Sequence, residues 1–401
     1  MNNKIIKING TGCALADFFY TKVEFNSPQF LKYSSKQIGD GGLSPGKLVF
    51  TEELEEFSNK PYNEILKEIT GVDSPVSFNI GGPSLVSLIH ASQLLSVTEF
   101  EVNFYGNAGN DDISEDIFKM VQKTPLNISN YKRTGSKATS FTDVFSDATY
   151  DDGHGERTFI NNIGAAWDCS PEMLSSDFFD ANIVCFGGTA LVPQIHDNLT
   201  NLLKKAKANN CITIVNTVFD FRNEKNAPEK PWPLGNTEES LKMIDMLIMD
   251  LEEALKISAR KTINESVNYF KEQQVSSFII TNGSKNSIVY SDGTLFQKTS
   301  TTKFPVSQII LDELKENTNL KGDTTGCGDN FAGGIIASIA WQLKSKKIGQ
   351  FDLHEALSWA TASGGYACYY VGGTYFEKYS NEKFEKVSQY QVEYKKQIQT
   401  K

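Results

Sequence analysis

Short apolar runs alternate with helical patterns over most of this 401-residue chain, and this alternation constrains its fold more than any other feature. The runs have the length of strands and are apolar at nearly every position, as strands buried on both faces must be. A strand, a helix and a strand in succession predict parallel pairing, with helices on both faces of the sheet. The expected strands are residues 5–8, 102–105, 183–186, 212–215, 246–249 and 278–281.

Two segments break this rhythm, at about 17–45 and 138–160. Apolar and polar residues alternate in them, which is typical of half-exposed β-strands. We expect these segments to form a small sheet that projects from the main sheet as a lid, inserted in a single domain over 1–401. A turn at 291–294 between two apolar runs predicts a further β-hairpin.

Charge and cysteine content exclude several classes of protein. Asp and Glu outnumber Lys and Arg by 49 to 39, so the net charge is −10. This balance argues against a nucleic-acid partner and against an anionic membrane surface. The six cysteines form no C-x-x-C pair and no zinc spacing, which predicts a reducing compartment without disulfides. No apolar run approaches the roughly 20 residues of a membrane span, and the start lacks a signal-peptide pattern, so we expect a cytoplasmic protein.

The most informative local string is Gly-Asp-Thr-Thr-Gly-Cys-Gly-Asp-Asn-Phe-Ala-Gly-Gly at 322–334, which runs directly into an apolar helical pattern. Gly326 and Gly328 let backbone N–H groups converge without interference from a Cβ atom. The start of the following helix adds unpaired N–H groups and partial positive charge, which together predict an anion site. Asp329 at this junction is placed either to cap the helix or to accept a proton from a substrate hydroxyl.

The string resembles the second signature of the PfkB (ribokinase-like) carbohydrate kinase family, with Cys327 in the place of an alanine. Further motifs follow in the family's order from Gly12 to about Gly373. The resemblance implies a ribokinase-like α/β fold, a doubly wound and mostly parallel sheet with helices on both faces and a small β-sheet lid. It also implies ATP-dependent phosphorylation of a hydroxyl. The catalytic residues that it implies are the base Asp329 and the backbone donors Gly326, Cys327 and Gly328.

Three motifs are similar to the family's acceptor-binding residues. Gly12 and Asp17 follow the first strand and fit the pattern G-x-x-x-x-D, whose carboxylate binds substrate hydroxyls strongly. Gly81 and Gly82 resemble the first signature, in which bare backbone lies against the substrate. Arg157 lies in a G-x-R-x-F stretch near the lid, where it either meets an anionic or polyol substrate or is an ordinary exposed arginine on a strand.

The resemblance places the nucleotide and its metal at the ends of later strands. Asp250 and Glu253 resemble the family's N-x-x-E motif, which orients Mg²⁺ and its water shell near the triphosphate; the plain alternative is a helix N-cap with acids in the first turn. The implied cofactors are ATP and Mg²⁺, and a monovalent cation is left open. The nucleotide-binding residues that the resemblance implies are Thr281, Gly283, Thr325, Gly326 and Gly328.

Three positions depart from the family's pattern, and one string is a decoy. Val86 stands where the family commonly has an asparagine that binds the sugar, Asp250 replaces an asparagine, and Asn286 replaces a glycine. We expect Asn286 to replace the glycine because asparagine tolerates the left-handed conformation. The string at 41–47 fits G-x-x-x-x-G-K, but Leu48 replaces the Ser or Thr of a phosphate loop and no buried strand precedes it, so we expect a plain loop.

The acceptor is left open between two substrate classes. A sugar is the default, and a nucleoside is the close alternative because the stretch before Gly81 is long, as in adenosine kinases. A catalytically silent protein that binds a nucleotide or sugar and regulates a partner is a third reading, which the departures at Val86, Asp250 and Asn286 keep open. A homodimer through the lid is plausible, since its strands offer a surface to bury.

Overall fold

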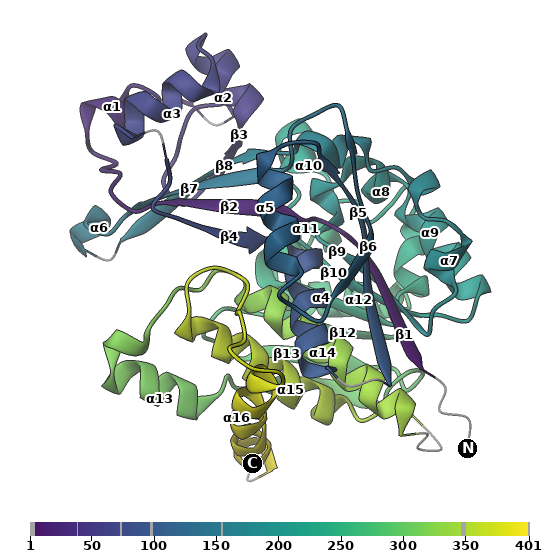
Figure 1. Ribbon diagram of the computed structural model, residues 1–401. Helices are drawn as coiled ribbons and strands as arrows, with labels where there is room; N and C mark the ends of the chain where they lie inside the picture. The colour runs from purple at the N-terminus through teal and green to yellow at the C-terminus, as the bar shows by residue number, and fades with distance from the viewer. Residues whose placement is uncertain are drawn as a thin grey trace.

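The computed structural model has a nine-stranded main sheet and a separate five-stranded sheet (Figure 1). It describes residues 5–37, 39–72, 74–96, 99–153, 155–345 and 350–399. In order across the main sheet, its strands are β14 (Thr299–Phe304), β13 (Ser287–Ser291), β12 (Ser277–Thr281), β11 (Met246–Asp250), β10 (Ile212–Asn216), β9 (Ile183–Gly187), β1 (Ile6–Gly12), β5 (Phe100–Gly109) and β6 (Asn127–Gly135).

All six expected strands are present in the main sheet, and they pair in parallel. In β1, Ile8 lies between Val102 of β5 and Ile183 of β9. The strands β12, β13 and β14 pair antiparallel at one edge. The hairpin expected at 291–294 therefore joins β13 to β14, although β14 begins only at Thr299.

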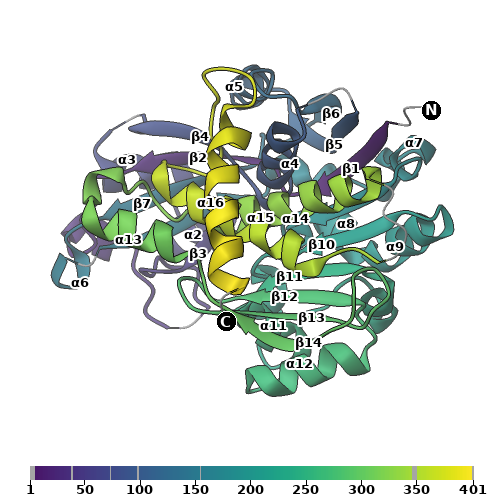
Figure 2. The same ribbon diagram turned by 90° about the horizontal axis from the view of Figure 1, so that it is seen from below.

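Helices cover both faces of the main sheet (Figure 2). Successive residues of β9 belong to different cores, because side chains alternate along a strand: Ile183 and Cys185 pack on one face, Val184 and Phe186 on the other. The helices of the first core are α4 (Pro83–Leu94), α5 (Asp112–Val121), α14 (Cys327–Lys344), α15 (Leu353–Tyr366) and α16 (Glu382–Gln399). The helices of the second are α7 (Ser176–Phe179), α8 (Pro193–Asp197), α9 (Leu199–Ala208), α11 (Leu251–Ser258) and α12 (Ile263–Glu272).

The small sheet lies to one side of the main sheet and carries its own apolar core (Figure 1). In order, its strands are β3 (Leu48–Phe50), β8 (Glu156–Asn162), β7 (Phe141–Asp147), β2 (Leu15–Tyr20) and β4 (Ser77–Gly81). The helices α1 (Pro28–Leu31), α2 (Thr51–Ser58) and α3 (Tyr62–Thr70) contribute apolar side chains to this core.

The alternating segment at 17–45 forms less strand than its pattern predicts. Strand β2 ends at Tyr20, and α1 follows because Pro28 occupies the first turn and the Ser27 hydroxyl accepts a hydrogen bond from the Phe30 N–H. The second segment, 138–160, forms β7 and most of β8, as expected. Residues 38 and 154 within these segments lie outside the described residues.

The remaining elements are short. The decoy string at 41–47 is a loop followed by β3 rather than by a helix, as its context predicts. None of the described helices combines the length and apolar character needed to cross a membrane. The remaining helices are α6 (Tyr150–Gly153), α10 (Phe221–Asn226) and α13 (Gln308–Glu316), with 3₁₀ turns η1 (Gly164–Asp168), η2 (Pro171–Met173), η3 (Thr189–Leu191), η4 (Glu238–Met243), η5 (Thr318–Leu320) and η6 (Ala367–Tyr369).

Candidate active site

The glycine-rich turn before α14 leaves backbone N–H groups free. Gly326 has a φ of 75°, and a Cβ atom there would collide with Gly373, so only glycine fits. Among the described residues, no acceptor meets the N–H groups of Gly326, Gly328 and Asp329. The Cys327 N–H instead bonds to the Thr324 carbonyl oxygen at 3.3 Å. Of the three expected donors, Gly326 and Gly328 are therefore free, the one assigned to Cys327 is already used, and the Asp329 N–H is a further free donor.

Asp329 lies in the first turn of α14 and is half-buried. No described residue donates a hydrogen bond to its carboxylate, so it does not cap its own helix. Burial raises its pKa to about 7. A carboxylate with a pKa near neutrality and no protein partner is suited to accept a proton from a bound hydroxyl.

Asp17 is a second carboxylate without a protein partner among the described residues. It lies on β2 with 8% of its surface exposed. Burial first, and then the negative charges of Asp329 and Asp323, raise its pKa to about 8. A Cβ atom on Gly81 would collide with this carboxylate, and Gly82 has a φ of 93°. Neither position tolerates a side chain, and the bare backbone of Gly81 lies against the Asp17 carboxylate.

Arg157 connects the small sheet to the glycine-rich turn. Its guanidinium donates to the Thr325 hydroxyl at 2.9 Å, so this strand residue is neither free nor fully exposed. The Asp323 carboxylate accepts from the Thr325 N–H at 2.8 Å and from the Gly372 N–H at 3.3 Å. These contacts fix the turn between β8 and the loop that follows η6.

A cavity of about 320 Å³ adjoins the glycine-rich turn. Of the predicted nucleotide-binding residues, Thr281, Gly283 and Gly328 line it. Helix α13 forms one wall with Ile310, and the buried Ser307 hydroxyl before this helix has no hydrogen-bond partner among the described residues. A mainly apolar cavity with an unpaired hydroxyl fits a flat heterocycle that carries hydrogen-bonding edges.

Two positions that depart from the family's pattern, Val86 and Asn286, can be compared with the structure. Val86 is buried on α4, and a Cβ atom on Gly373 would lie 3.0 Å from it, so it packs under the loop after η6. Asn286 is not among the residues with positive φ, whereas Gly283 in the same turn has a φ of 53°. The expectation that Asn286 replaces a left-handed glycine is wrong, because the turn places that conformation at Gly283.

Asp250 and Glu253 form a capping box at the start of α11. The Glu253 N–H donates to Asp250 at 2.8 Å, the Asp250 N–H donates to Glu253 at 2.9 Å, and the Thr217 hydroxyl donates to Glu253 at 2.6 Å. Burial raises the pKa of Glu253. The plain reading of this motif, an N-cap with acids in the first turn, is therefore present in the structure.

The same acids fit Mg²⁺ in one respect. Asp250 is exposed, and one of its carboxylate oxygens has no partner among the described residues. Mg²⁺ keeps most of its waters and uses one or two carboxylates together with substrate phosphates. Within the described ranges no group of three His, Cys, Asp or Glu side chains could hold a metal alone, so a metal here would need the phosphates.

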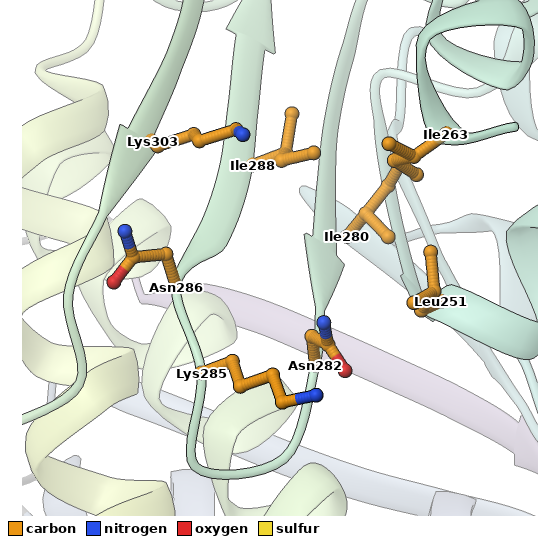
Figure 3. A pocket seen from close by; sticks show the side chains of 8 residues that line it. All are labelled: Leu251, Ile263, Ile280, Asn282, Lys285, Asn286, Ile288 and Lys303. Atoms are coloured by element: carbon orange, nitrogen blue, oxygen red, sulfur yellow. The ribbon is translucent and has the colours of Figure 1, made fainter.

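A second cavity, of about 440 Å³, lies beside α11 and α12 (Figure 3). Ile280 of β12 pairs with Ile288 of β13, which pairs with Lys303 of β14, so the three side chains share one face. Its remaining lining residues are Leu251, Ile263, Asn282, Lys285 and Asn286. This cavity has no carboxylate to act as a base, so it is not the candidate active site.

The structure places three further residues in the site to which the sequence alone assigned no role. Asp323 precedes the glycines and holds the turn, and its position in the quoted signature could have indicated this. Ser307 and Cys368 reach the cavity only through tertiary packing, of α13 against α15 and α16 and of η6 against α14. No local pattern marks either of them.

The fold agrees with that of known proteins. An adenosine kinase from Schistosoma mansoni, solved with 2-fluoroadenosine, matches with a TM-score of 0.68 and 16% identity over 92% of this chain and 97% of that one. An E. coli protein assigned as a ribokinase II, solved with ATP and Mg²⁺, matches with a TM-score of 0.63 and 17% identity over 98% and 100%. The profile of the pfkB family carbohydrate kinases matches residues 59–378. The chain therefore belongs to the pfkB carbohydrate kinase family and is a phosphotransferase with an alcohol group as acceptor.

Proposed function

We propose that this protein uses ATP to phosphorylate a hydroxyl of a sugar or sugar-like molecule, with Asp329 as the general base. One observation carries the proposal. Asp17 and Asp329 are carboxylates without described protein partners, and Asp329 adjoins free backbone N–H groups at the edge of a 320 Å³ cavity. Buried polar groups normally find partners, so such an arrangement fits a substrate that supplies them.

Each group has a defined part in the transfer. Asp17 accepts hydrogen bonds from the acceptor's hydroxyls, with Gly81 and Gly82 allowing close approach. Asp329 takes the proton of the reacting hydroxyl, whose oxygen then forms the new bond to phosphorus as the bond to the leaving diphosphate breaks. The N–H groups of Gly326, Gly328 and Asp329 stabilise the charge on the phosphoryl oxygens.

The remaining site residues hold the nucleotide and exclude water. Thr281 and Gly283 line the cavity, and Thr325 belongs to the adjoining glycine-rich turn; we assign all three to binding of the nucleotide. ATP would supply the phosphoryl group, and Asp250 and Glu253 would hold a Mg²⁺ ion that neutralises its phosphates. We assign the small sheet as a lid, because Arg157 already reaches the turn from β8 and would add positive charge beside the transferred group.

A nucleoside is the second candidate acceptor. Helices α2 and α3 lengthen the chain before Gly81 and cover the small sheet (Figure 1). The S. mansoni neighbour, which binds adenosine analogues, covers 92% of this chain. A nucleoside presents ribose hydroxyls to Asp17 in the same way as a sugar, so the two classes differ in what the lid encloses.

The direct test is ADP release from ATP and Mg²⁺ with a panel of sugars, sugar phosphates, polyols and nucleosides. We expect one acceptor class to give turnover that disappears in Asp329→Asn. The matched control is Asp180→Asn, which changes an exposed carboxylate outside the site and should retain turnover. Nucleotide binding without turnover on any member would favour the silent binding protein instead. Equal turnover by wild type and Asp329→Asn would refute the base.

Three properties stay predictions. They are the cytoplasmic location, a homodimer through the lid, and a monovalent cation near the site. Size-exclusion chromatography with light scattering tests the dimer, and turnover in potassium, sodium and tetramethylammonium salts tests the cation.

A further inference from the structure

Two cysteines face each other in the wall of the proposed nucleotide cavity. The sulfur of Cys327, the first residue of α14, lies 3.4 Å from the sulfur of Cys368 in η6. Both line the 320 Å³ cavity and both are partly exposed. The other cysteines of the chain are buried in the described structure: Cys13, Cys169, Cys185 and Cys211.

The surroundings make the two thiols unequal. The hydrogen bond between the sulfurs lowers the pKa of Cys368 and, together with burial, raises that of Cys327. Burial and the negative charge of Asp323 oppose ionisation of Cys368, and the positive charge of Lys321 favours it, while the net shift of its pKa is downward. The thiolate is the reactive form of cysteine, so Cys368 is the expected nucleophile, and Cys327 lies in contact to resolve the product.

We propose that Cys327 and Cys368 are a redox modification site, at which a two-electron oxidant such as a peroxide forms a disulfide that narrows the nucleotide cavity. The Cys368 thiolate attacks one peroxide oxygen, which gives a sulfenic acid and releases water from hydrogen peroxide. The Cys327 sulfur then attacks the oxidised sulfur, the new S–S bond forms and a second water leaves. In total, two thiols lose two electrons and two protons, and one peroxide becomes two waters.

The disulfide alters nucleotide binding through the backbone of both cysteines. A disulfide needs its sulfurs about 2.05 Å apart, so the present 3.4 Å must shorten. The Cys327 N–H is bonded to the Thr324 carbonyl, and the Cys368 carbonyl accepts from the Gly322 N–H at 2.8 Å. Drawing the sulfurs together therefore shifts both ends of the glycine-rich turn and narrows the cavity between them.

The first experiment separates the chemistry from its effect. Protein treated with one equivalent of hydrogen peroxide is digested without reduction, and mass spectrometry identifies the cross-linked peptide. ATP affinity is measured by calorimetry before oxidation, after oxidation and after dithiothreitol. We expect the cross-linked peptide to join Cys327 to Cys368. ATP affinity should fall at least tenfold on oxidation and recover with dithiothreitol. Bound ATP should slow the oxidation. Absence of this peptide, or unchanged affinity in the cross-linked protein, would overturn the proposal.

Variants then locate the effect. Cys368→Ala should show the same ATP affinity with and without peroxide, whatever its affinity in the reduced state. The matched control Cys185→Ala, which changes a buried cysteine of β9, should respond as wild type does. The effect on affinity rests on the proposed function, but the two can fail separately. Reduced protein that does not bind ATP contradicts the nucleotide site, whereas reduced protein that binds ATP and forms no disulfide contradicts only the redox site.

Discussion

The two helix entries of the site, at α14 and α11, both bring acids to a helix N-terminus, yet they use them in opposite ways. At α11 the carboxylates of Asp250 and Glu253 accept hydrogen bonds from each other's backbone N–H groups. At α14 no described residue donates to Asp329, and neighbouring N–H groups are free as well. At α11 the acids hydrogen-bond to the N–H groups of their own helix. At α14 both the Asp329 carboxylate and the neighbouring N–H groups are available to a ligand.

The difference follows from the residues around each acid. Glu253 stands three residues after Asp250, the spacing of a capping box, so each side chain reaches the other's backbone. Gly326 is the N-cap residue of α14 and Gly328 lies in its first turn, and neither has a side-chain oxygen to cap the helix. An unsatisfied helix start costs stability and is a ready anion site. An acid at a helix N-terminus is therefore a candidate base where the helix does not use it.

The largest expected effect is on catalysis at α14. Asp329→Asn keeps the shape of the side chain but removes the base, so turnover should fall by about 10²–10⁴-fold, the range for general bases. ATP affinity, measured by calorimetry, should stay within about threefold, since the N–H groups remain. Parallel losses of turnover and ATP affinity would show instead that Asp329 holds the fold of the nucleotide site.

A substitution of Arg157 tests whether the start of α14 needs positive charge from the small sheet. Arg157→Met should lower kcat/KM by about 100-fold, the order expected for one donor to developing charge. Arg133→Met is a control, because Arg133 is an exposed arginine of β6 outside the site. Steady-state kinetics at varied ATP provide the comparison. Similar values for the two variants would remove Arg157 from the mechanism.

A substitution in the capping box of α11 should change the stability of the protein more than its catalytic rate. Glu253→Ala removes the acceptor of the Asp250 N–H and the Thr217 hydroxyl, so unfolding free energy should fall by about 1 kcal/mol. The same change should weaken apparent Mg²⁺ affinity by about tenfold through the lost support of Asp250. Glu253→Gln keeps an oxygen at this place and should be as stable as wild type in urea unfolding. Unaltered Mg²⁺ dependence in Glu253→Ala would leave this entry with only a capping role.

The last expected effect is a pH-dependent gain in stability at α14. The pKa of Asp329 rises from 3.8 to about 7 in the folded protein, so wild type loses stability as pH increases between these values. Asp329→Asn lacks this titration. Its melting temperature, relative to wild type, should therefore be higher at pH 8 than at pH 5 in calorimetry. If the melting temperatures of the two proteins change in parallel with pH, the Asp329 carboxyl ionises in the folded protein without loss of stability.

Much of the fold could be predicted, because its signals are local. Apolar runs buried on both faces identify the parallel strands of the main sheet, and all six expected strands are present. The small sheet was harder to delimit. Its strand β4 (Ser77–Gly81) lies beside β2 through pairing over about sixty residues of chain, and the pattern at 17–45 continues beyond β2 into α1 and loops.

The candidate site divides in the same way. Glycine spacing and strand ends identify Asp17, Asp329 and their turns from the sequence. The contact of Arg157 with Thr325, the contact of Cys327 with Cys368 and the wall formed by α13 depend on tertiary packing. Such contacts join segments that no periodicity relates.

The measurement that tests the central claim most directly is the pH dependence of kcat/KM for wild type, once an acceptor is identified. The account predicts a tenfold rise per pH unit that levels off near pH 7, because Asp329 must lose its proton to act as the base. The break should persist in Asp17→Asn and vanish in Asp329→Asn, while ATP affinity varies little over the same range. A profile that is flat from pH 5 to pH 9, or one whose break survives in Asp329→Asn, would contradict the assignment of Asp329 as the base.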